Sequence, residues 1–152
     1  MKIIDTRDLL KRKEELEEFK SILEAAEEAL IQHAENEPEE DESNTKSEFE
    51  AIEKELESSL KSATEDFGAA EEKELEEIEE LENEISEFRH GATMIPERDF
   101  EEYARELAEE LEAIPSDAQW PCTYIDWAQA ASELEQNYSN VSFQGEYYLV
   151  RG

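Results

Sequence analysis

The chain has 152 residues, of which 45 are Asp or Glu and 14 are Lys or Arg, so its formal charge is -31. A surface this negative is repelled by nucleic acid and by anionic lipid head groups, which excludes direct nucleic-acid binding and membrane association. Hydrophobic residues make up 38% of the chain. Their regular spacing favours folded helices with one apolar face over a disordered acidic tail.

Cysteine and histidine content argues against a metal site or a disulfide framework. Cys122 is the only cysteine, and the two histidines, His33 and His90, lie far apart in the sequence. No apolar stretch approaches the length of a membrane span, and the first residues do not resemble a signal peptide. We therefore expect a protein of a reducing cytoplasm that holds no metal and no cofactor.

Residues 5–36 are predicted to form one long helix. Asp5 or Thr6 can cap its first turn, because a short side-chain oxygen accepts a free backbone N–H there. Leucine recurs every seven residues, with Phe19 and Ala26 at companion positions, which is typical of a coiled coil. The leucines are Leu9, Leu16, Leu23 and Leu30. Residues 35–44 are acidic, contain Pro38 and predict a loop.

Two further apolar stripes follow this loop. Thr45 and Glu48 have the spacing of a capping box for a second helix. Gly68 either breaks that helix or lies within it, and the pattern then continues to Arg89. Gly91 supplies a stop. Stripes this narrow must meet, so an antiparallel coiled-coil hairpin that closes at the acidic loop is the simplest arrangement. Whether Gly68 folds the chain back into three helices is left open.

The composition changes after Gly91, so we predict an acidic helical coiled-coil region at 1–91 and a small α+β domain at 92–152. Pro96 suits the start of a helix that runs to about Glu112. Asp126 can cap a second helix. The last residues predict a β-hairpin that turns at Gln144-Gly145. The overall fold class is mainly α, with a minor β component (α+β).

Aromatic and apolar residues of this second region predict its core. The hairpin register puts Val141, Phe143, Tyr148 and Val150 on one face, which we expect to lie against the two helices. Trp120, Tyr124 and Trp127 are interpreted as core residues. The alternative is that these three aromatics form a dimer face.

The density of carboxylates is the feature that suggests a function. Ten glutamates occur between Glu71 and Glu87, opposed only by Lys73. They are Glu71, Glu72, Glu74, Glu76, Glu77, Glu79, Glu80, Glu82, Glu84 and Glu87. On a helix they place one negative charge per roughly 2.4 Å of axis, against one per about 1.7 Å in duplex DNA. The row therefore predicts a surface that imitates DNA phosphates.

A generic acidic coiled coil is the competing interpretation, because glutamate is a good helix former. Ordinary coiled coils alternate Glu with Lys or Arg, since opposite charges four residues apart stabilise a helix by about 0.2–0.5 kcal/mol per pair. This chain forgoes most such pairs. Its carboxylates lie on predicted solvent faces, and no nucleophile–base set or glycine-rich phosphate loop accompanies them. We therefore expect a protein that is not an enzyme.

The second region resembles the C-terminal part of the ArdA antirestriction family and is similar to related acidic phage and prophage proteins. The resemblance covers about the last 55 residues. Three stretches carry it: Phe100-Glu101-Glu102-Tyr103-Ala104-Arg105-Glu106-Leu107-Ala108-Glu109-Glu110-Leu111; Tyr124-Ile125-Asp126-Trp127 with Ala130-Ala131-Ser132-Glu133-Leu134; and Gly145-Glu146-Tyr147-Tyr148-Leu149-Val150-Arg151. Residues 1–90 depart from the family, because they are a glutamate-rich coiled coil.

The resemblance implies a dimeric DNA mimic of a phage or mobile element that blocks type I restriction–modification enzymes by occupying their DNA groove. The acidic positions it implies are Glu101, Glu102, Glu106, Glu109, Glu110 and Asp126. Two alternatives stay open: an anti-CRISPR protein or nuclease inhibitor that acts by the same mimicry, and a structural or scaffolding acidic coiled coil.

Overall fold

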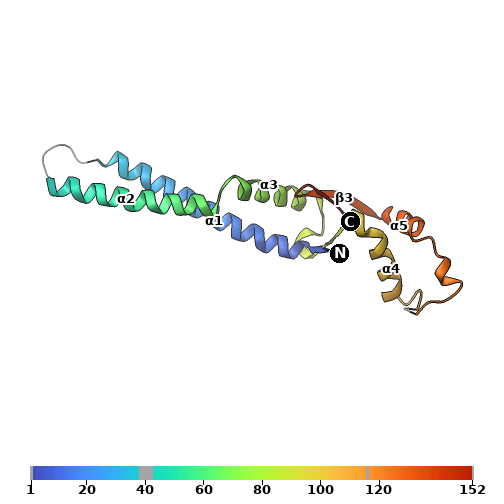
Figure 1. Ribbon diagram of the computed structural model, residues 1–152. Coiled ribbons are helices and arrows are strands. Elements are labelled where there is room, and N and C mark those ends of the chain that lie inside the picture. The colour runs from blue at the N-terminus through green and yellow to red at the C-terminus, as the bar shows by residue number, and fades with distance from the viewer. Residues whose placement is uncertain (1, 38–42, 116, 152) are drawn as a thin grey trace. The chain divides into compact units, whose positions relative to one another are not determined.

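The computed structural model describes residues 2–37, 43–115 and 117–151, without the side chains of 43–45. Within these residues the protein is mainly helical and contains one four-stranded antiparallel sheet, as expected in outline (Figure 1). The α-helices are α1 (Thr6–Glu35), α2 (Ser43–Asp66), α3 (Ala69–Glu84), α4 (Phe100–Glu110) and α5 (Trp127–Glu135). The strands are β1 (Ile4–Asp5), β2 (Thr93–Pro96), β3 (Tyr138–Phe143) and β4 (Glu146–Arg151).

The chain divides into two compact units. Unit 1 consists of Met1–Lys11 and Glu77–Gly152, and unit 2 of Arg12–Glu76. The sequence placed a boundary after residue 91, whereas these units divide within α1 and α3. The physical reason is strand pairing, because β1 joins a sheet whose other strands lie beyond residue 92.

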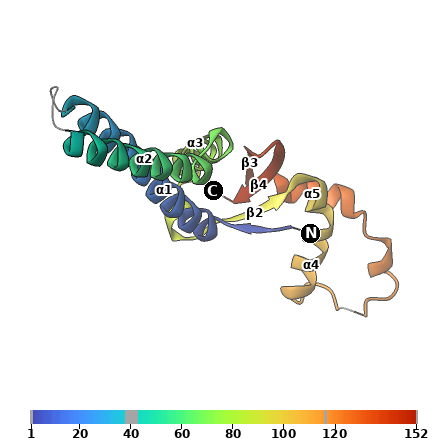
Figure 2. The same cartoon turned by 60° about the vertical axis from the view of Figure 1, so that its left-hand side comes forward.

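Unit 2 contains most of α1 together with α2. The two helices lie side by side in both views (Figures 1 and 2). The His33 ring stacks on the Phe49 ring with centroids 3.9 Å apart, and His33 Nε2 lies 3.0 Å from the Phe49 carbonyl oxygen. The predicted heptad positions are unequally covered: Leu16 is fully buried, but Leu23 and Leu30 are only half-buried. The predicted loop between the helices falls largely outside the described residues.

Gly68 lies between α2 and α3. The second predicted helix therefore breaks at Gly68 and does not pass through it. The Gly68 N–H donates to Glu71 Oε2 at 3.2 Å, so the third residue of α3 reaches back to cap its own helix. Two other predicted helix limits were wrong. Helix α2 begins at Ser43, ahead of Thr45, and α3 ends at Glu84, five residues before Arg89.

The sheet of unit 1 has the strand order β1-β2-β4-β3, and every pairing is antiparallel. Met94 pairs with Ile4 on one side and with Val150 on the other. Strands β1 and β2 were not predicted. Pro96, expected to start a helix, is the last residue of β2, and α4 begins at Phe100 after a 3-10 turn at Glu97–Asp99.

The hairpin of β3 and β4 was predicted correctly. Gln144 (φ +50°) and Gly145 (φ +78°) both have positive φ, as a two-residue turn of this hand requires. Val141 pairs with Tyr148, and both are buried, as are Phe143 and Val150.

The covering of the two sheet faces differs from the expectation. Leu149 and Ile95 pack with Phe100 and Ala104 of α4 and with Ala131 of α5. Side chains alternate along a strand, so the predicted face, with Val141 and Tyr148, points away from these helices. The end of α3 lies beside β3 in both views (Figures 1 and 2). This sheet is therefore buried on both sides, which the sequence did not indicate.

Candidate functional site

Helix α3 carries nine of the ten predicted glutamates, and Glu87 follows it. Leu75, Ile78 and Leu81 are buried on one face. A helix completes one turn every 3.6 residues. Positions about half a turn away from these three residues therefore lie on the opposite, solvent-exposed side. The exposed glutamates of α3 are Glu72, Glu76, Glu79, Glu80 and Glu84, which we call the α3 row.

None of the members of the α3 row takes part in an ion pair among the described residues, although the exposed Lys73 follows Glu72 directly in the sequence. Its five carboxylates span thirteen residues, about 20 Å of axis, or one charge per about 4 Å. One strand of duplex DNA carries a phosphate per about 3.4 Å of axis. The charge spacing of the row therefore approaches that of a single DNA strand. It is wider than the spacing of roughly 2.4 Å that all ten glutamates would give.

The other predicted glutamates of this helix have local structural roles. Glu71 caps α3 through Gly68. Glu74, with a side chain 20% exposed, accepts from Arg12 Nε at 3.1 Å. The hydrogen bond that Arg12 donates to Glu74, and after it the one that Arg12 donates to Glu15, raise the pKa of Arg12. Glu82 accepts from Arg89 Nε at 2.7 Å. These three carboxylates hold the fold, so they contribute less to an external anionic surface.

The predicted acidic residues of α4 form a less uniform surface. Glu101, Glu102, Glu106 and Glu110 are exposed, whereas Glu109 is half-buried and lies 3.7 Å from Arg105 Nε. Residues Glu101 and Glu102 line a shallow hollow of about 350 Å³ together with Arg98 and Arg105. The two arginines partly neutralise this face.

Asp126, also predicted as part of the acidic surface, caps α5. Its Oδ1 accepts the Gln129 N–H at 3.1 Å, as expected from its place before the helix. One carboxylate oxygen is therefore committed to the backbone, and Asp126 is first a structural residue.

Sequence reasoning left the exposed acids of α1 and α2 out of the site. Glu14, Glu18 and Glu24 of α1 are exposed, and so are Glu48, Glu50, Glu55, Glu57 and Glu65 of α2. By composition unit 2 has 24 Asp and Glu against 7 Lys and Arg, and unit 1 has 21 against 7. Both units are strongly anionic. The acids of α1 and α2 are spread over longer helices, so no stretch of those helices as long as α3 has as many glutamates.

Basic residues near the start of the chain are used locally. Arg7 Nη2 contacts Asp5 Oδ2 at 2.6 Å, Arg12 Nη1 contacts Glu15 Oε2 at 2.7 Å, and Lys13 Nζ lies 3.6 Å from Glu17 Oε1. The hydrogen bonds from the Arg7 side chain and backbone lower the pKa of Asp5 to about 2. Arg12 is the exception, because it also pairs with Glu74 of α3, another acidic helix of the same chain, with Nε 3.1 Å from Glu74 Oε1.

The described residues contain neither a metal site nor a membrane-spanning helix. Across 2–37, 43–115 and 117–151, no three side chains of the metal-ligating types come together in a way that could hold an ion. None of the helices in this part of the chain is long and apolar enough to cross a membrane. Comparison with protein-family profiles, curated proteins and solved structures found no match to this chain.

Proposed function

We propose that this protein is a DNA-mimic inhibitor, made by a phage or another mobile element, that occupies the DNA-binding groove of a host defence protein. The observation that carries the proposal is the α3 row: five exposed carboxylates with no ion-pair partner among the described residues, spaced much like the phosphates of one DNA strand. A type I restriction–modification enzyme is the proposed target, because residues 98–152 resemble the antirestriction proteins named above.

The mechanism is competition. Lysine and arginine side chains that normally hold phosphates pair instead with the glutamates of the α3 row. Long-range attraction by a chain of formal charge -31 speeds the encounter, because charge complementarity mainly raises association rates. No bond is made or broken, so the protein acts without catalysis, in the cytoplasm of the host bacterium.

The proposed frame for this surface is a long antiparallel coiled-coil hairpin of α1 and α2. Three features support it: the side-by-side helices, the seven-residue leucine repeat and the stacking of His33 on Phe49 (Figure 1). A stiff frame matters, because fixed charges act on a partner without the entropic cost of being ordered first.

The test is capture of a partner from bacterial lysate, followed by competition with duplex DNA. Duplex DNA should displace the captured protein, and the binding should weaken as salt is added. Replacing all five glutamates of the α3 row by glutamine should reduce capture strongly. Failure of duplex DNA to displace the captured protein would refute the mimicry.

A matched control separates the row from total charge. The control changes five exposed glutamates of α2 to glutamine: Glu48, Glu50, Glu55, Glu57 and Glu65. Both sets remove five charges from the same total of -31. We expect the α2 set to slow association slightly and to leave capture largely intact. Equal loss in both sets would mean that the field as a whole, and not the row, binds the partner.

The identity of the captured protein distinguishes the targets. A restriction enzyme supports the antirestriction role. A CRISPR effector or a recombination nuclease that DNA displaces supports the same mimicry directed at another target.

A structural coiled coil is the second candidate function, and a specific observation favours it. Ile22, Ile31 and Ile52 of α1 and α2 are 51%, 55% and 49% exposed. Exposed isoleucines on long helices suit packing against another helix, including that of a second copy in a homodimer. Two results together would identify a scaffold. The variants Ile22→Ser and Ile31→Ser would dissociate a homodimer, and replacing the glutamates of the α3 row by glutamine would leave partner capture unchanged.

A further inference from the structure

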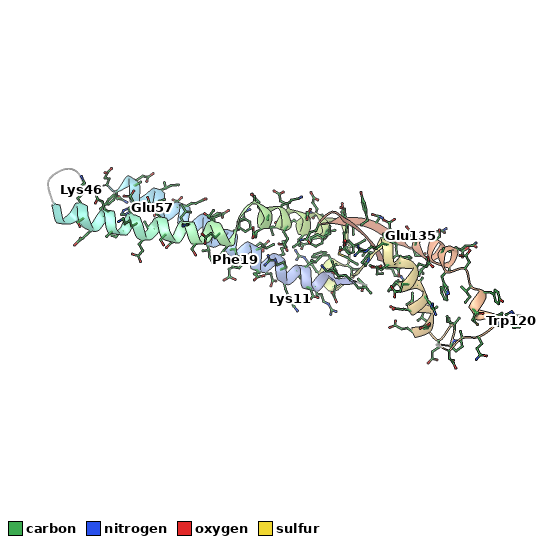
Figure 3. The ribbon with its side chains drawn as sticks, viewed as in Figure 1. Lys11, Phe19, Lys46, Glu57, Trp120 and Glu135 are labelled. Atoms are coloured by element: carbon green, nitrogen blue, oxygen red, sulfur yellow. The ribbon has the colours of Figure 1, made fainter. Side chains whose placement is uncertain are left out.

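The loop between α4 and α5 exposes large apolar side chains. Leu111, Trp120 and Tyr124 are 70%, 76% and 79% exposed, which corrects the expectation that Trp120 and Tyr124 belong to the core. Figure 3 shows Trp120 on this loop, directed away from both helices. We call residues 111–115 and 117–126 the aromatic loop. Its exposed rings are notable, because tryptophan and tyrosine dominate the binding energy of protein interfaces.

Successive turns hold the two rings in place. The Cys122 N–H donates to the Gln119 carbonyl at 2.8 Å, closing a turn around Trp120, and the Tyr124 N–H donates to the Pro121 carbonyl at 3.0 Å, closing the next. The backbone that carries the rings is therefore ordered before a partner arrives, so less backbone entropy is lost on binding.

The stretch of sequence that carries the rings is anionic. Between Arg105 and Arg151 the sequence contains nine acidic residues and no Lys or Arg. Glu112 and Asp117 of the loop are both exposed. A cation attracted to these carboxylates therefore meets the faces of Trp120 and Tyr124, and this segment of the chain supplies no cation of its own.

We propose that the aromatic loop docks on an arginine-rich face of a partner protein, with the rings of Trp120 and Tyr124 covering guanidinium groups that Glu112 and Asp117 attract. This inference rests on the proposed function, because the partner is the same basic protein. It adds an anchor that duplex DNA does not have. A guanidinium fits better than an ammonium, because it is planar, stacks on aromatic faces and is more weakly hydrated.

Charge complementarity selects this occupant over two others. A second copy would bring its own Glu112 and Asp117 toward the same loop, and an anionic membrane would be repelled. A basic protein face gains from both the carboxylates and the rings.

The experiment measures binding of fluorescein-labelled deca-arginine and deca-lysine peptides to the full chain at physiological salt. We expect the wild type to prefer deca-arginine. The double variant Trp120→Leu, Tyr124→Leu keeps apolar bulk but loses both ring faces. It should bind deca-arginine about tenfold more weakly and lose the preference over deca-lysine.

Two variants serve as controls. Trp120→Phe keeps a ring face and should stay within about threefold of the wild type. Tyr147→Leu removes an equally accessible ring, 61% exposed, from β4 and should leave binding unchanged. Folding is checked by circular dichroism. Unchanged deca-arginine binding by the double variant, or an equal loss from Tyr147→Leu, would overturn the proposal.

Further measurements separate this inference from the other occupants and from mimicry. Loop-dependent self-association in sedimentation, or loop-dependent binding to phosphatidylcholine vesicles, would replace the basic partner with a second copy or a membrane. If the double variant still captures the host protein that duplex DNA displaces, the loop inference fails alone. If DNA displaces nothing while the loop variants lose deca-arginine, mimicry fails alone.

Discussion

Thr6 offers the sharpest test of what holds unit 1 together. Its side chain is fully buried, its Oγ1 donates to the Phe88 carbonyl at 2.8 Å, and the same oxygen accepts the Ala92 N–H at 2.7 Å. The Thr6 N–H also donates to the Ala92 carbonyl at 2.9 Å. One residue at the start of α1 therefore satisfies backbone groups more than 80 residues later in the chain.

Thr6→Val keeps the shape and removes both side-chain hydrogen bonds. Phe88 and Ala92 are buried, so a carbonyl and an N–H are left without partners away from water. Each unsatisfied buried group costs about 1–3 kcal/mol, which gives a loss of about 2–6 kcal/mol for the pair. That is a large part of the roughly 5–15 kcal/mol by which a domain is stable.

Urea unfolding followed by tryptophan fluorescence is the appropriate assay, because Trp120 and Trp127 both lie in unit 1. Thr64→Val is the matched control: its hydroxyl donates to the Leu60 carbonyl at 2.8 Å on an exposed helix surface, where water replaces the bond. We expect a loss of about 0.5 kcal/mol or less there. Thr6→Ser should retain most of the stability. Equal effects of Thr6→Val and Thr64→Val would refute the reasoning.

Four further predictions follow from the same structure. Burial, and then the hydrogen bond with Tyr138, raises the pKa of Tyr103 to about 12, so its contribution to stability is complete below about pH 10 and is lost as pH rises through 12; burial also raises the pKa of Tyr148, so the late part of an absorbance titration should become smaller in Tyr103→Phe without disappearing. Asp5, with its pKa lowered to about 2, contributes stability above about pH 4 that is lost as pH falls toward 2, and Arg7→Gln should return the pKa measured by NMR toward 3.8. Leu81→Ala should cost about 2–5 kcal/mol in urea unfolding, because Leu81 is 1% exposed, whereas Leu111→Ala, at 70% exposed, should cost little. Added sodium chloride should raise the melting temperature, since it screens repulsion among 45 acidic residues, and a melting temperature that falls with salt would contradict this.

The elements that could be predicted from sequence are those whose signal is local. The apolar stripes of α1 and α2 repeat over many turns, and the hairpin is marked by Gln144-Gly145 between two apolar runs. Strand β1 has two residues and β2 has four, ending in Pro96, so neither is long enough to show alternation. Their pairing joins Ile4 to Met94, a contact that no local pattern encodes.

The candidate site divides in the same way. Helical periodicity from the buried Leu75, Ile78 and Leu81 is sufficient to identify which glutamates of α3 face solvent. It cannot identify the glutamates that pair with residues distant in the sequence, because Arg12 and Glu74 are 62 residues apart. Trp120 was assigned to the core from residue type and from its spacing to Tyr124 and Trp127. Its exposure depends on a loop path that only the tertiary structure supplies.

The discontinuity of unit 1 has a consequence for how the protein is made. Residues 12–76 leave the ribosome as a continuous piece and can fold while the rest is still being synthesised. Ile4 must wait for Met94, and Met94 must wait for Val150, before the sheet can close. The sheet of unit 1 can therefore close only after Val150 has been synthesised, whereas every residue of unit 2 is made much earlier.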